Sequence, residues 1–438
     1  MILRFKNLGI IETAEIDMSK PFIVFTGPNG TGKTYLSYVL ADLTSSFGGY
    51  FLSLARHREE ASQILNIYNP SLFDTVDEVS GILEPEIMYN VFKKGISRVS
   101  LRYLSTLNLN EIDGDPFSIE VVSTLEEWKE ELYKMKLDCG LFFKLHKESD
   151  SFEYKVVATP ESKIPKKEKN DYEFEQALFL NAIFFHGAAN AQMFTAERTG
   201  IALFSKELAI GRLKADPTAI PRYPRAISES LADAEDRAYH SKHKSDYKDL
   251  ADVIEKDILH GKIKVTKDGE LTLNRGNNTF DLAHSSSTMK ALADIVFYVR
   301  HQARKMSRLL IDEPEIHLHP DNQLLLARVF SRMVHRGLQV VISTHSDYII
   351  RELNNLIMLN YVGEDYIKKA KKMGFMQEEF IDAQMIQPYL FVLQENGRVR
   401  TEPIKVGKEG FAVKSIDDAI ASLNDAAEDI YYALLQNE

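Results

Sequence analysis

The sequence is almost without cysteine, because Cys139 is the only one among 438 residues. A single cysteine excludes an internal disulfide, and it excludes a zinc site built on paired Cys-x-x-Cys ligands. Chains that dispense with disulfides are typical of reducing compartments, so we expect a cytoplasmic protein.

Long apolar runs are also missing from the sequence. No stretch approaches the ~18 consecutive apolar residues that a membrane-spanning helix needs. Residues 1–6 contain no apolar core of the kind that a secretory signal carries. We therefore expect no membrane partner.

A surplus of positive charge is lacking, since 53 Lys and Arg residues against 64 Asp and Glu residues give a net charge of −11. Proteins that clamp nucleic acid over much of their surface are usually basic. A local basic groove remains compatible with an acidic chain, so nucleic acid stays an open partner that nothing here indicates. The sequence also shows no repeat at a fixed period and no sustained heptads, so we expect no long coiled-coil arm.

What is present is the composition of an ordinary globular protein, with 44% apolar and 27% charged residues. A chain of this length can form two or three domain-sized cores. Alternating apolar residues flank two turn sequences, Asp268-Gly269 and Asn396-Gly397, and this pattern predicts two β-hairpins.

The most informative motif is G-x-x-x-x-G-K-T at residues 27–34. An apolar run at 22–25 precedes it and a helical pattern follows it, which is the strand–loop–helix context of a nucleotide-phosphate site. Backbone N–H groups of such a loop surround the phosphates, and the helix N-terminus adds its dipole. We expect ATP to be bound by Gly27, Asn29, Gly30, Thr31, Gly32, Lys33 and Thr34.

Within this loop, Lys33 is expected to reach the β- and γ-phosphates, and the Thr34 hydroxyl to ligate Mg²⁺. A second apolar run, at 309–311, ends in Asp312 and Glu313. Asp312 suits the Mg²⁺ shell, and Glu313 suits a general base that activates the attacking water. The alternative, two solvated acids at a strand end, is disfavoured by the phosphate loop upstream.

Two histidines follow the acidic pair, in His317-Leu318-His319. Such a pair can bind a metal ion, but a third and a fourth ligand are not evident. We favour a structural interpretation, in which Pro320 occupies the first turn of a helix.

A further strand pattern, at 338–342, leads into Ser343-Thr344-His345-Ser346. Because imidazole can donate a hydrogen bond to a phosphate oxygen, His345 is predicted to be a catalytic residue that senses the γ-phosphate. The alternative is a histidine that only caps the strand end.

Ser285, Ser286 and Ser287 precede another helical pattern. Serines at a helix start are ordinary N-caps, but the free N–H groups there can also bind an anion. From their position in the chain, we expect these serines to meet the γ-phosphate bound by a partner subunit.

The order of these parts resembles the head of ABC-type ATPases, in the SMC and RecF branch rather than the hexameric AAA+ machines. The segment from Leu3-Arg4-Phe5 through Gly27-Pro28-Asn29-Gly30 resembles that branch. Residues 313–320 and 343–346 resemble the OLD-like AAA family ATPases, a group that includes the ATPase subunits of prokaryotic anti-phage systems such as PARIS and Septu. Ala196-Glu197-Arg198 looks like a segment often seen in this group.

The sequence departs from this family pattern in three places. Ser286 and Ser287 stand where related heads often have glycine within the L-S-G-G-Q signature, and Gln192 is only a weak candidate for the Q-loop glutamine. OLD proteins end in a nuclease domain with an Asp-x-Asp motif, which residues 351–438 lack. We therefore expect no nuclease in this chain.

The resemblance implies an α/β fold, with an ABC-type P-loop ATPase head, a helical insertion and a small α/β C-terminal extension. We expect residues 1–44 and 172–350 to form the two lobes of the head, 45–171 the insertion and 351–438 the extension. The resemblance also implies a homo-oligomer in which two heads sandwich two ATP molecules, either as a dimer or as an assembly of dimers.

In function, the resemblance implies a sensor or regulator ATPase of a bacterial anti-phage defence system, which controls a separate effector protein, a nuclease or a toxin. The alternative is an SMC/RecF-like DNA-repair ATPase that binds duplex DNA directly. The acidic balance and the lack of coiled-coil arms favour the first, and the long insertion argues against a transporter subunit. The basic runs at 166–167 and 368–372 lack interleaved aromatic residues and are expected to be solvated faces.

Overall fold

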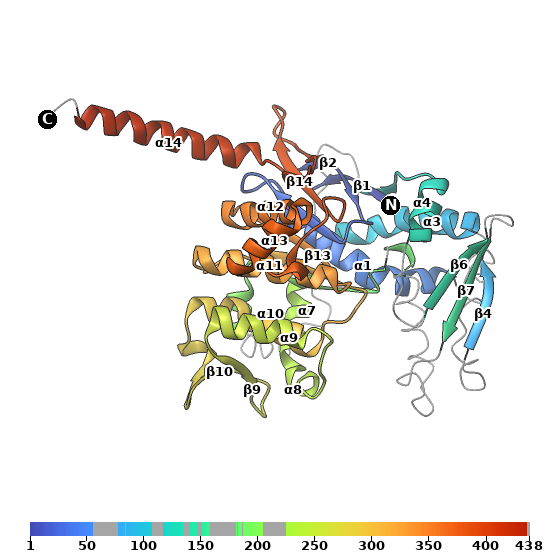
Figure 1. The fold of residues 1–438 in the computed structure, drawn as a ribbon. Helices are drawn as coiled ribbons and strands as arrows, with labels where there is room; N and C mark the ends of the chain where they lie inside the picture. Colours follow the sequence, from blue (N-terminus) through green and yellow to red (C-terminus); the bar gives the residue numbers. More distant parts are fainter. Residues whose placement is uncertain are drawn as a thin grey trace.

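The computed structural model describes residues 1–55, 78–83, 85–106, 117–134, 141–146, 151–157, 181, 183–185, 187–204 and 225–435. Within these residues a nine-stranded sheet has the order β5-β1-β2-β15-β14-β3-β13-β12-β8, and two three-stranded sheets have the orders β11-β10-β9 and β4-β7-β6. Helices cover the faces of the large sheet, and the last helix leaves the rest of the chain (Figure 1).

The strands of the large sheet are β1 (Ile2–Leu8), β2 (Ile11–Asp17), β3 (Phe22–Thr26), β5 (Ser118–Val121), β8 (Asn190–Phe194), β12 (Ser307–Asp312), β13 (Gln339–Ser343), β14 (Ile386–Leu393) and β15 (Val399–Pro403). The strands of the two small sheets are β4 (Glu78–Leu83), β6 (Leu141–His146), β7 (Ser151–Val157), β9 (Lys262–Val265), β10 (Leu271–Arg275) and β11 (Asn278–Asp281).

The α-helices are α1 (Lys33–Ala55), α3 (Pro85–Thr106), α4 (Leu125–Lys134), α7 (Arg225–Glu235), α8 (Arg237–His240), α9 (Lys248–Val253), α10 (Ser287–His301), α11 (Pro320–His335), α12 (Asp347–Tyr361), α13 (Glu364–Lys372) and α14 (Lys414–Leu435). A π-helix spans Ile254–Leu259, and short 3₁₀ turns span Leu282–His284 and Gln377–Glu379.

The central strands are buried on both faces, as parallel strands covered by helices must be. Every residue of β3, β12 and β13 is buried. Along β3, Ile23 and Phe25 point into the core that includes α1, and Phe22 and Val24 point into the core that includes α10 and α11. Because both faces of these strands are covered by apolar cores, their residues form continuous apolar runs in the sequence.

Parallel pairing brings the carboxyl ends of three strands to one edge of the sheet. β13 pairs with β3 on one side and with β12 on the other, and Asp312 lies opposite Ser343. Loops at this edge of a parallel sheet are the usual place for a ligand. The phosphate loop, Asp312-Glu313 and His345 all follow strands that end there.

The mixed α/β architecture that the sequence predicts is confirmed, and so are both hairpins. β9 pairs with β10 around Gly269, and β14 pairs with β15 around Gly397. Pro320 lies in the first turn of α11, as predicted.

Residues 351–438, predicted to be a C-terminal extension, contribute two strands to the large sheet. β15 and β14 lie between β2 and β3, inside the large sheet. In the predicted insertion, β5 also joins this sheet and pairs with β1, whereas β4, β6 and β7 form a sheet of their own beside helices α3 and α4. The domain boundaries at 44, 171 and 350 stay a prediction, but the large sheet draws strands from all these segments.

Some sequence features lie outside the described residues, namely Cys139 and the run of charged residues at 163–171. The basic run at 368–372 is described, and its four lysines are exposed on α13, as expected of a solvated face. Among the described helices, none combines the length and the apolar character needed to cross a bilayer.

Replacing Phe391 by alanine tests whether β14 is part of the core of the head. Phe391 is fully buried, and its ring packs edge-on against that of Phe25, with 5.4 Å between ring centres. We expect Phe391→Ala to lower the free energy of unfolding by about 3–5 kcal/mol, since a buried aromatic ring leaves a cavity. Leu393→Ala, in the same strand but 58% exposed, is the matched control and should stay within about 0.5 kcal/mol of the parent. Equal losses in denaturant melts of both variants would contradict this placement.

Candidate nucleotide site

The phosphate loop joins β3 to α1 and depends on its glycines. Gly27, Gly30 and Gly32 have φ angles of +131°, +75° and +89°. A Cβ atom on Gly27 would lie 2.6 Å from the Phe391 carbonyl oxygen, and one on Gly32 would lie 2.9 Å from the side chain of Ile11. These close approaches leave no room for a side chain at Gly27 or Gly32, so only glycine lets the loop pack this tightly against β14 and β2.

Lys33 is folded back over this loop. Its side chain is buried, and Nζ donates hydrogen bonds to the carbonyl oxygens of Gly27 (3.0 Å) and Pro28 (2.8 Å). Burial lowers the pKa of the Lys33 ammonium, while the nearby carboxylates of Asp312 and Glu313 oppose this shift. Pro28, Asn29 and Gly30 are exposed at the mouth of the loop. The ammonium thus lies against the loop carbonyl oxygens, close to the exposed mouth of the loop.

The two residues predicted to hold Mg²⁺ are in direct contact, although 278 positions separate them in the chain. Thr34 Oγ1 donates a hydrogen bond to Asp312 Oδ2 at 2.7 Å. The other carboxylate oxygen, Oδ1, accepts from the Ser343 hydroxyl. Asp312 is therefore buried with both oxygens hydrogen-bonded, at the end of β12.

This donor set fits Mg²⁺. The Thr34 hydroxyl can offer a lone pair to the ion while its proton still points to Asp312, and both groups are the hard oxygen ligands that Mg²⁺ prefers. The described residues contain no cluster of three or more His, Cys, Asp or Glu side chains that could enclose a metal. A site with few protein ligands suits Mg²⁺, which usually keeps several waters and substrate phosphates.

Glu313 follows directly and has an unusual backbone. Its φ angle of +48° lies in the left-handed region, which costs a residue other than glycine of order 1–3 kcal/mol. Its N–H donates to the Ser343 carbonyl oxygen at 2.9 Å, which holds the turn against β13. Burial, with the charge of Asp312, raises the pKa of the half-buried Glu313 carboxyl. A carboxylate with a raised pKa is a stronger base, as a group that activates water requires.

His345 lies in the short loop between β13 and α12, and Glu315 holds its backbone in place. Glu315 Oε1 accepts hydrogen bonds from the Thr344 hydroxyl (2.9 Å) and from the backbone N–H of His345 (2.7 Å). Burial and the charge of Lys33 lower the pKa of the His345 imidazole, so it is neutral at neutral pH. Glu315 was not singled out from the sequence, although its place in Glu313-Pro314-Glu315 pointed to this loop.

The histidine pair at 317 and 319 serves the backbone. His319 is the N-cap of α11, where its Nδ1 accepts from the Asp321 N–H at 3.4 Å. The carbonyl oxygen of His317 accepts from the Thr288 hydroxyl at 2.8 Å, which joins this loop to the start of α10. These contacts agree with the structural interpretation of the pair.

The serines at the start of α10 make local hydrogen bonds. Ser286 is the N-cap and accepts from the Met289 N–H at 3.3 Å, and the Ser285 hydroxyl donates to the Asp281 carbonyl oxygen at 2.8 Å. Ser286 and Ser287 are exposed. They therefore have the ordinary capping role, and their exposure leaves their predicted role toward a partner subunit open.

The residue that sequence reasoning undervalued is Arg198, which lies after β8 and is 2% exposed. Its guanidinium donates to the carbonyl oxygens of Asp312 (2.8 Å) and Glu313 (2.9 Å). It also donates to those of Thr195 (3.2 Å) and Ala291 (3.0 Å). Burial lowers the pKa of Arg198 to about 10, so it stays charged. One side chain thus ties the acidic pair to α10.

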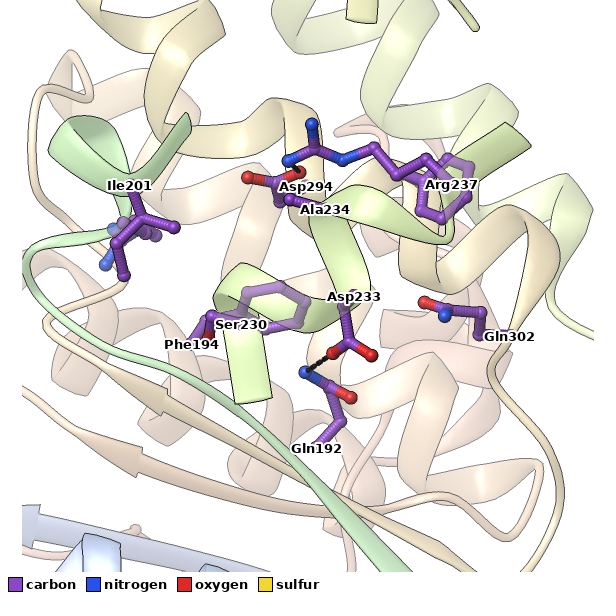
Figure 2. A pocket seen from close by; sticks show the side chains of 11 residues that line it. Gln192, Phe194, Ile201, Ser230, Asp233, Ala234, Arg237, Asp294 and Gln302 are labelled. Atoms are coloured by element: carbon purple, nitrogen blue, oxygen red, sulfur yellow. Dashed lines mark hydrogen bonds and ion pairs between the residues drawn. The ribbon is translucent and has the colours of Figure 1, made fainter. Parts of the chain in front are cut away.

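A small pocket lies between β8, α7 and α10, and Arg198 is among the residues that line it (Figure 2). Two pairs cross it: the Gln192 amide donates to Asp233 at 2.9 Å, and Arg237 pairs with Asp294 at 2.6 Å. Burial raises the pKa of the Asp233 carboxyl. Gln192 therefore lines this pocket, and its assignment as the Q-loop glutamine stays a prediction.

Replacing Arg198 by lysine tests this clamp. A lysine keeps the charge, but its ammonium cannot serve four carbonyl oxygens on separate elements. We expect Arg198→Lys to lower the free energy of unfolding by about 2–4 kcal/mol, since buried acceptors lose their donors. The exposed Arg351, paired with Asp347 at 2.6 Å, provides the control. Arg351→Lys should change stability by less than about 0.5 kcal/mol, and similar melts for the two variants would refute the clamp.

The chain was compared with protein families, curated proteins and solved structures. A model of the AAA ATPase domain family matches residues 1–350. The comparison with curated proteins gives no match.

Three solved SMC heads are similar over most of their length. An SMC head bound to the C-winged helix domain of ScpA is 12% identical, covers 93% of this chain and 98% of its own, and has a TM-score of 0.39. The SMC head domain from Thermotoga maritima is 11% identical, with coverages of 92% and 98% and a TM-score of 0.34. The SMC head of Pyrococcus furiosus, with an extended coiled coil and bound to a ScpA domain, is 12% identical, with coverages of 97% and 98% and a TM-score of 0.36.

The family model spans the phosphate loop, the strand that ends in Asp312 and the loop of His345. The chain belongs to the AAA ATPase domain family.

Proposed function

We propose that this chain binds ATP with Mg²⁺ at the edge formed by β3, β12 and β13, and that it hydrolyses the γ-phosphate. The observation that carries this proposal is the 2.7 Å hydrogen bond between Thr34 and Asp312, beside the buried ammonium of Lys33. When bound, Mg²⁺ neutralises charge on the β- and γ-phosphates. The remaining work falls to side chains of the protein.

Lys33 exchanges its two carbonyl partners in the loop for phosphate oxygens, which offer stronger, charge-assisted hydrogen bonds. Glu313 accepts the proton of the attacking water, for which its raised pKa suits it. The neutral imidazole of His345 donates one N–H to the γ-phosphate. When the γ-phosphate leaves after hydrolysis, this hydrogen bond is lost, and the change reaches the loop whose backbone Glu315 binds.

The active site is proposed to be completed by a second copy of the chain. The exposed serines at the start of α10 offer N–H donors, but their hydrogen bonds stay within residues 281–290. The family resemblance implies that two heads enclose two ATP molecules, with Ser285–Ser287 of one head at the nucleotide of the other. Closure around ATP would then change the position of everything attached to the heads.

At the level of biological role, we propose a sensor or regulator ATPase of a bacterial anti-phage defence system, acting in the cytoplasm on a separate effector protein. Support comes from the resemblance of residues 313–320 and 343–346 to the OLD-like group.

Replacing Glu313 by glutamine tests the general base. The amide keeps the shape of the side chain but cannot accept the proton, so we expect hydrolysis to fall ~10²–10⁴-fold while ATP still binds. Turnover is measured by phosphate release, and binding by calorimetry. Because the pKa of Glu313 is raised, wild-type turnover should fall on acidification at a pH above the ordinary range of a glutamate, and this limb should be missing in Glu313→Gln.

Lys33→Ala is the contrasting variant, since it removes the cation that faces the phosphates and should abolish binding itself. The exposed Lys368→Ala is the control for loss of a lysine, and it should bind and hydrolyse like wild type. Wild-type turnover by Glu313→Gln would move the base elsewhere, and tight ATP binding by Lys33→Ala would refute the site.

Mixing two inactive variants tests whether the site is shared. Lys33→Ala disables the phosphate loop, which is one half of the proposed site. Ser287→Arg blocks the other half, the start of α10, while leaving the Ser286 cap of that helix intact. In a mixed dimer, one of the two sites has both halves whole, so we expect turnover to reappear on mixing. If mixed dimers form but no ratio restores phosphate release, each chain works alone.

Capture of the partner tests the regulatory role. We expect the tagged chain, purified from its native host, to bring down a stoichiometric protein with a nuclease or toxin activity. The isolated chain should hydrolyse ATP but cleave neither DNA nor RNA. ATP-dependent binding of duplex DNA by the isolated chain, without such a partner, would favour an SMC/RecF-like DNA-repair ATPase instead.

A further inference from the structure

The last helix, α14, carries large apolar side chains into solvent. It leaves the rest of the chain as a single projecting helix (Figure 1). Leu423 is 70% exposed, Ile430 64% and Leu434 62%. Such a row of exposed large apolar residues marks an interaction surface rather than an ordinary helix face.

The N-terminal end of α14 is anchored to the core, and this fixes the direction of the helix. Phe411 and Val413, just before the helix, are buried in the core beside α10 and α11. The side-chain amide of Asn354 in α12 binds both backbone groups of Phe411. Its Nδ2 donates to the Phe411 carbonyl oxygen (2.8 Å), and its Oδ1 accepts from the Phe411 N–H (3.0 Å). Ile416 still packs against the core, so the apolar row starts on the head and continues off it.

Six apolar residues of α14 follow the spacing of a coiled coil, whereas Tyr431, Tyr432 and Leu435 lie outside this row. Steps of four and three residues alternate along the row Ile416, Ile420, Leu423, Ala427, Ile430 and Leu434. These are the a and d positions of three heptads. The flanking g positions are all alanine, at 419, 426 and 433, and most acidic residues fall on the opposite side, at 418, 425, 428 and 429. The row is therefore a seam almost free of charge.

We propose that this seam pairs with α14 of a second copy of the chain, in antiparallel orientation. Aligned in this way, the row is complementary to itself: Ile420 faces the second copy's Ile430, Leu423 faces its Ala427, and Leu434 faces its Ile416. Each a position meets a d position, and a large residue meets a small one at the centre. The acidic residues stay on the outside, so two acidic helices meet without facing each other's charges. Such self-complementarity is what a two-fold interface requires.

The charges at the helix ends select the antiparallel arrangement. Lys414 is the only basic residue of α14, and the last turn has none. In the antiparallel pair, Lys414 lies beside the negative end of the other helix dipole. A parallel pair would place the two C-terminal ends together without any cation. α14 shares no residue with the nucleotide site, so this contact links heads independently of ATP and would join ATP-closed dimers into larger assemblies.

The test is the oligomeric state of the full chain without nucleotide and with chelator present, measured by light scattering and sedimentation. We expect dimers for the wild type, and monomers for the double variant Leu423→Glu, Ile430→Glu, with the dissociation constant raised at least ~100-fold because the carboxylates would be buried without a partner against Ala427 and Ile420 of the second copy. Asp425→Lys, on the outer side of the same helix, is the control and should dimerise like wild type. Since all three positions are outside the core, thermal melts of the head should match. A monomeric wild type, or dimers of the double variant, would overturn the proposal.

Orientation is tested with spin labels in a Cys139→Ser background. Labels on Asp425→Cys lie at the centre of the antiparallel pair, whereas labels on Asp418→Cys lie seven residues away on each chain, which separates them by a further ~21 Å along the axis. We expect the label-to-label distance to be much longer for 418 than for 425. Equal distances at the two positions would establish a parallel pair and contradict the antiparallel alignment.

Discussion

Parallel pairing of β13 with β3 on one side and β12 on the other is the constraint on which the site depends. It places the phosphate loop, the acidic pair and His345 at one edge, although they come from three distant parts of the sequence. The 2.7 Å hydrogen bond from Thr34 to Asp312 is possible only because these strand ends are level. A shift of one residue in β12 would turn Asp312 to the other face of the sheet.

Around this edge, neutral backbone oxygens and one buried cation hold the acidic residues in place. Arg198 binds the carbonyl oxygens of Asp312 and Glu313, and the Ser343 carbonyl oxygen accepts the N–H of Glu313. These contacts maintain the left-handed backbone of Glu313, which would otherwise relax. Because Arg198 also reaches Ala291 of α10, a movement of α10 is coupled to the carboxylate proposed as the base.

The parts of the fold that the sequence predicted are those encoded over short stretches. The phosphate loop, the strand before Asp312, Pro320 at the start of α11 and the hairpins at Gly269 and Gly397 each follow from neighbouring residues. By contrast, nothing near residues 386–403 shows that β14 and β15 lie between β2 and β3, because strand order depends on contacts distant in sequence. The role of Arg198 was hidden for the same reason. Its four acceptors are all backbone carbonyl oxygens, and three of them lie 93 to 115 positions away. The sequence analysis found no sustained heptads, because the apolar row of α14 spans only residues 416–434. The exposure of Leu423, Ile430 and Leu434 in the structure is what marks this short row as a surface for pairing.

The central claim is that one edge of the sheet forms a nucleotide site that a second head completes. The most direct measurement is an experimental structure of the full chain with Mg²⁺ and a non-hydrolysable ATP analogue. The account predicts the β- and γ-phosphates on Lys33, Mg²⁺ at about 2.0–2.1 Å from Thr34 Oγ1, and Ser285–Ser287 of the second copy at the γ-phosphate. A nucleotide bound away from residues 27–34, or a γ-phosphate enclosed by one chain alone, would contradict it.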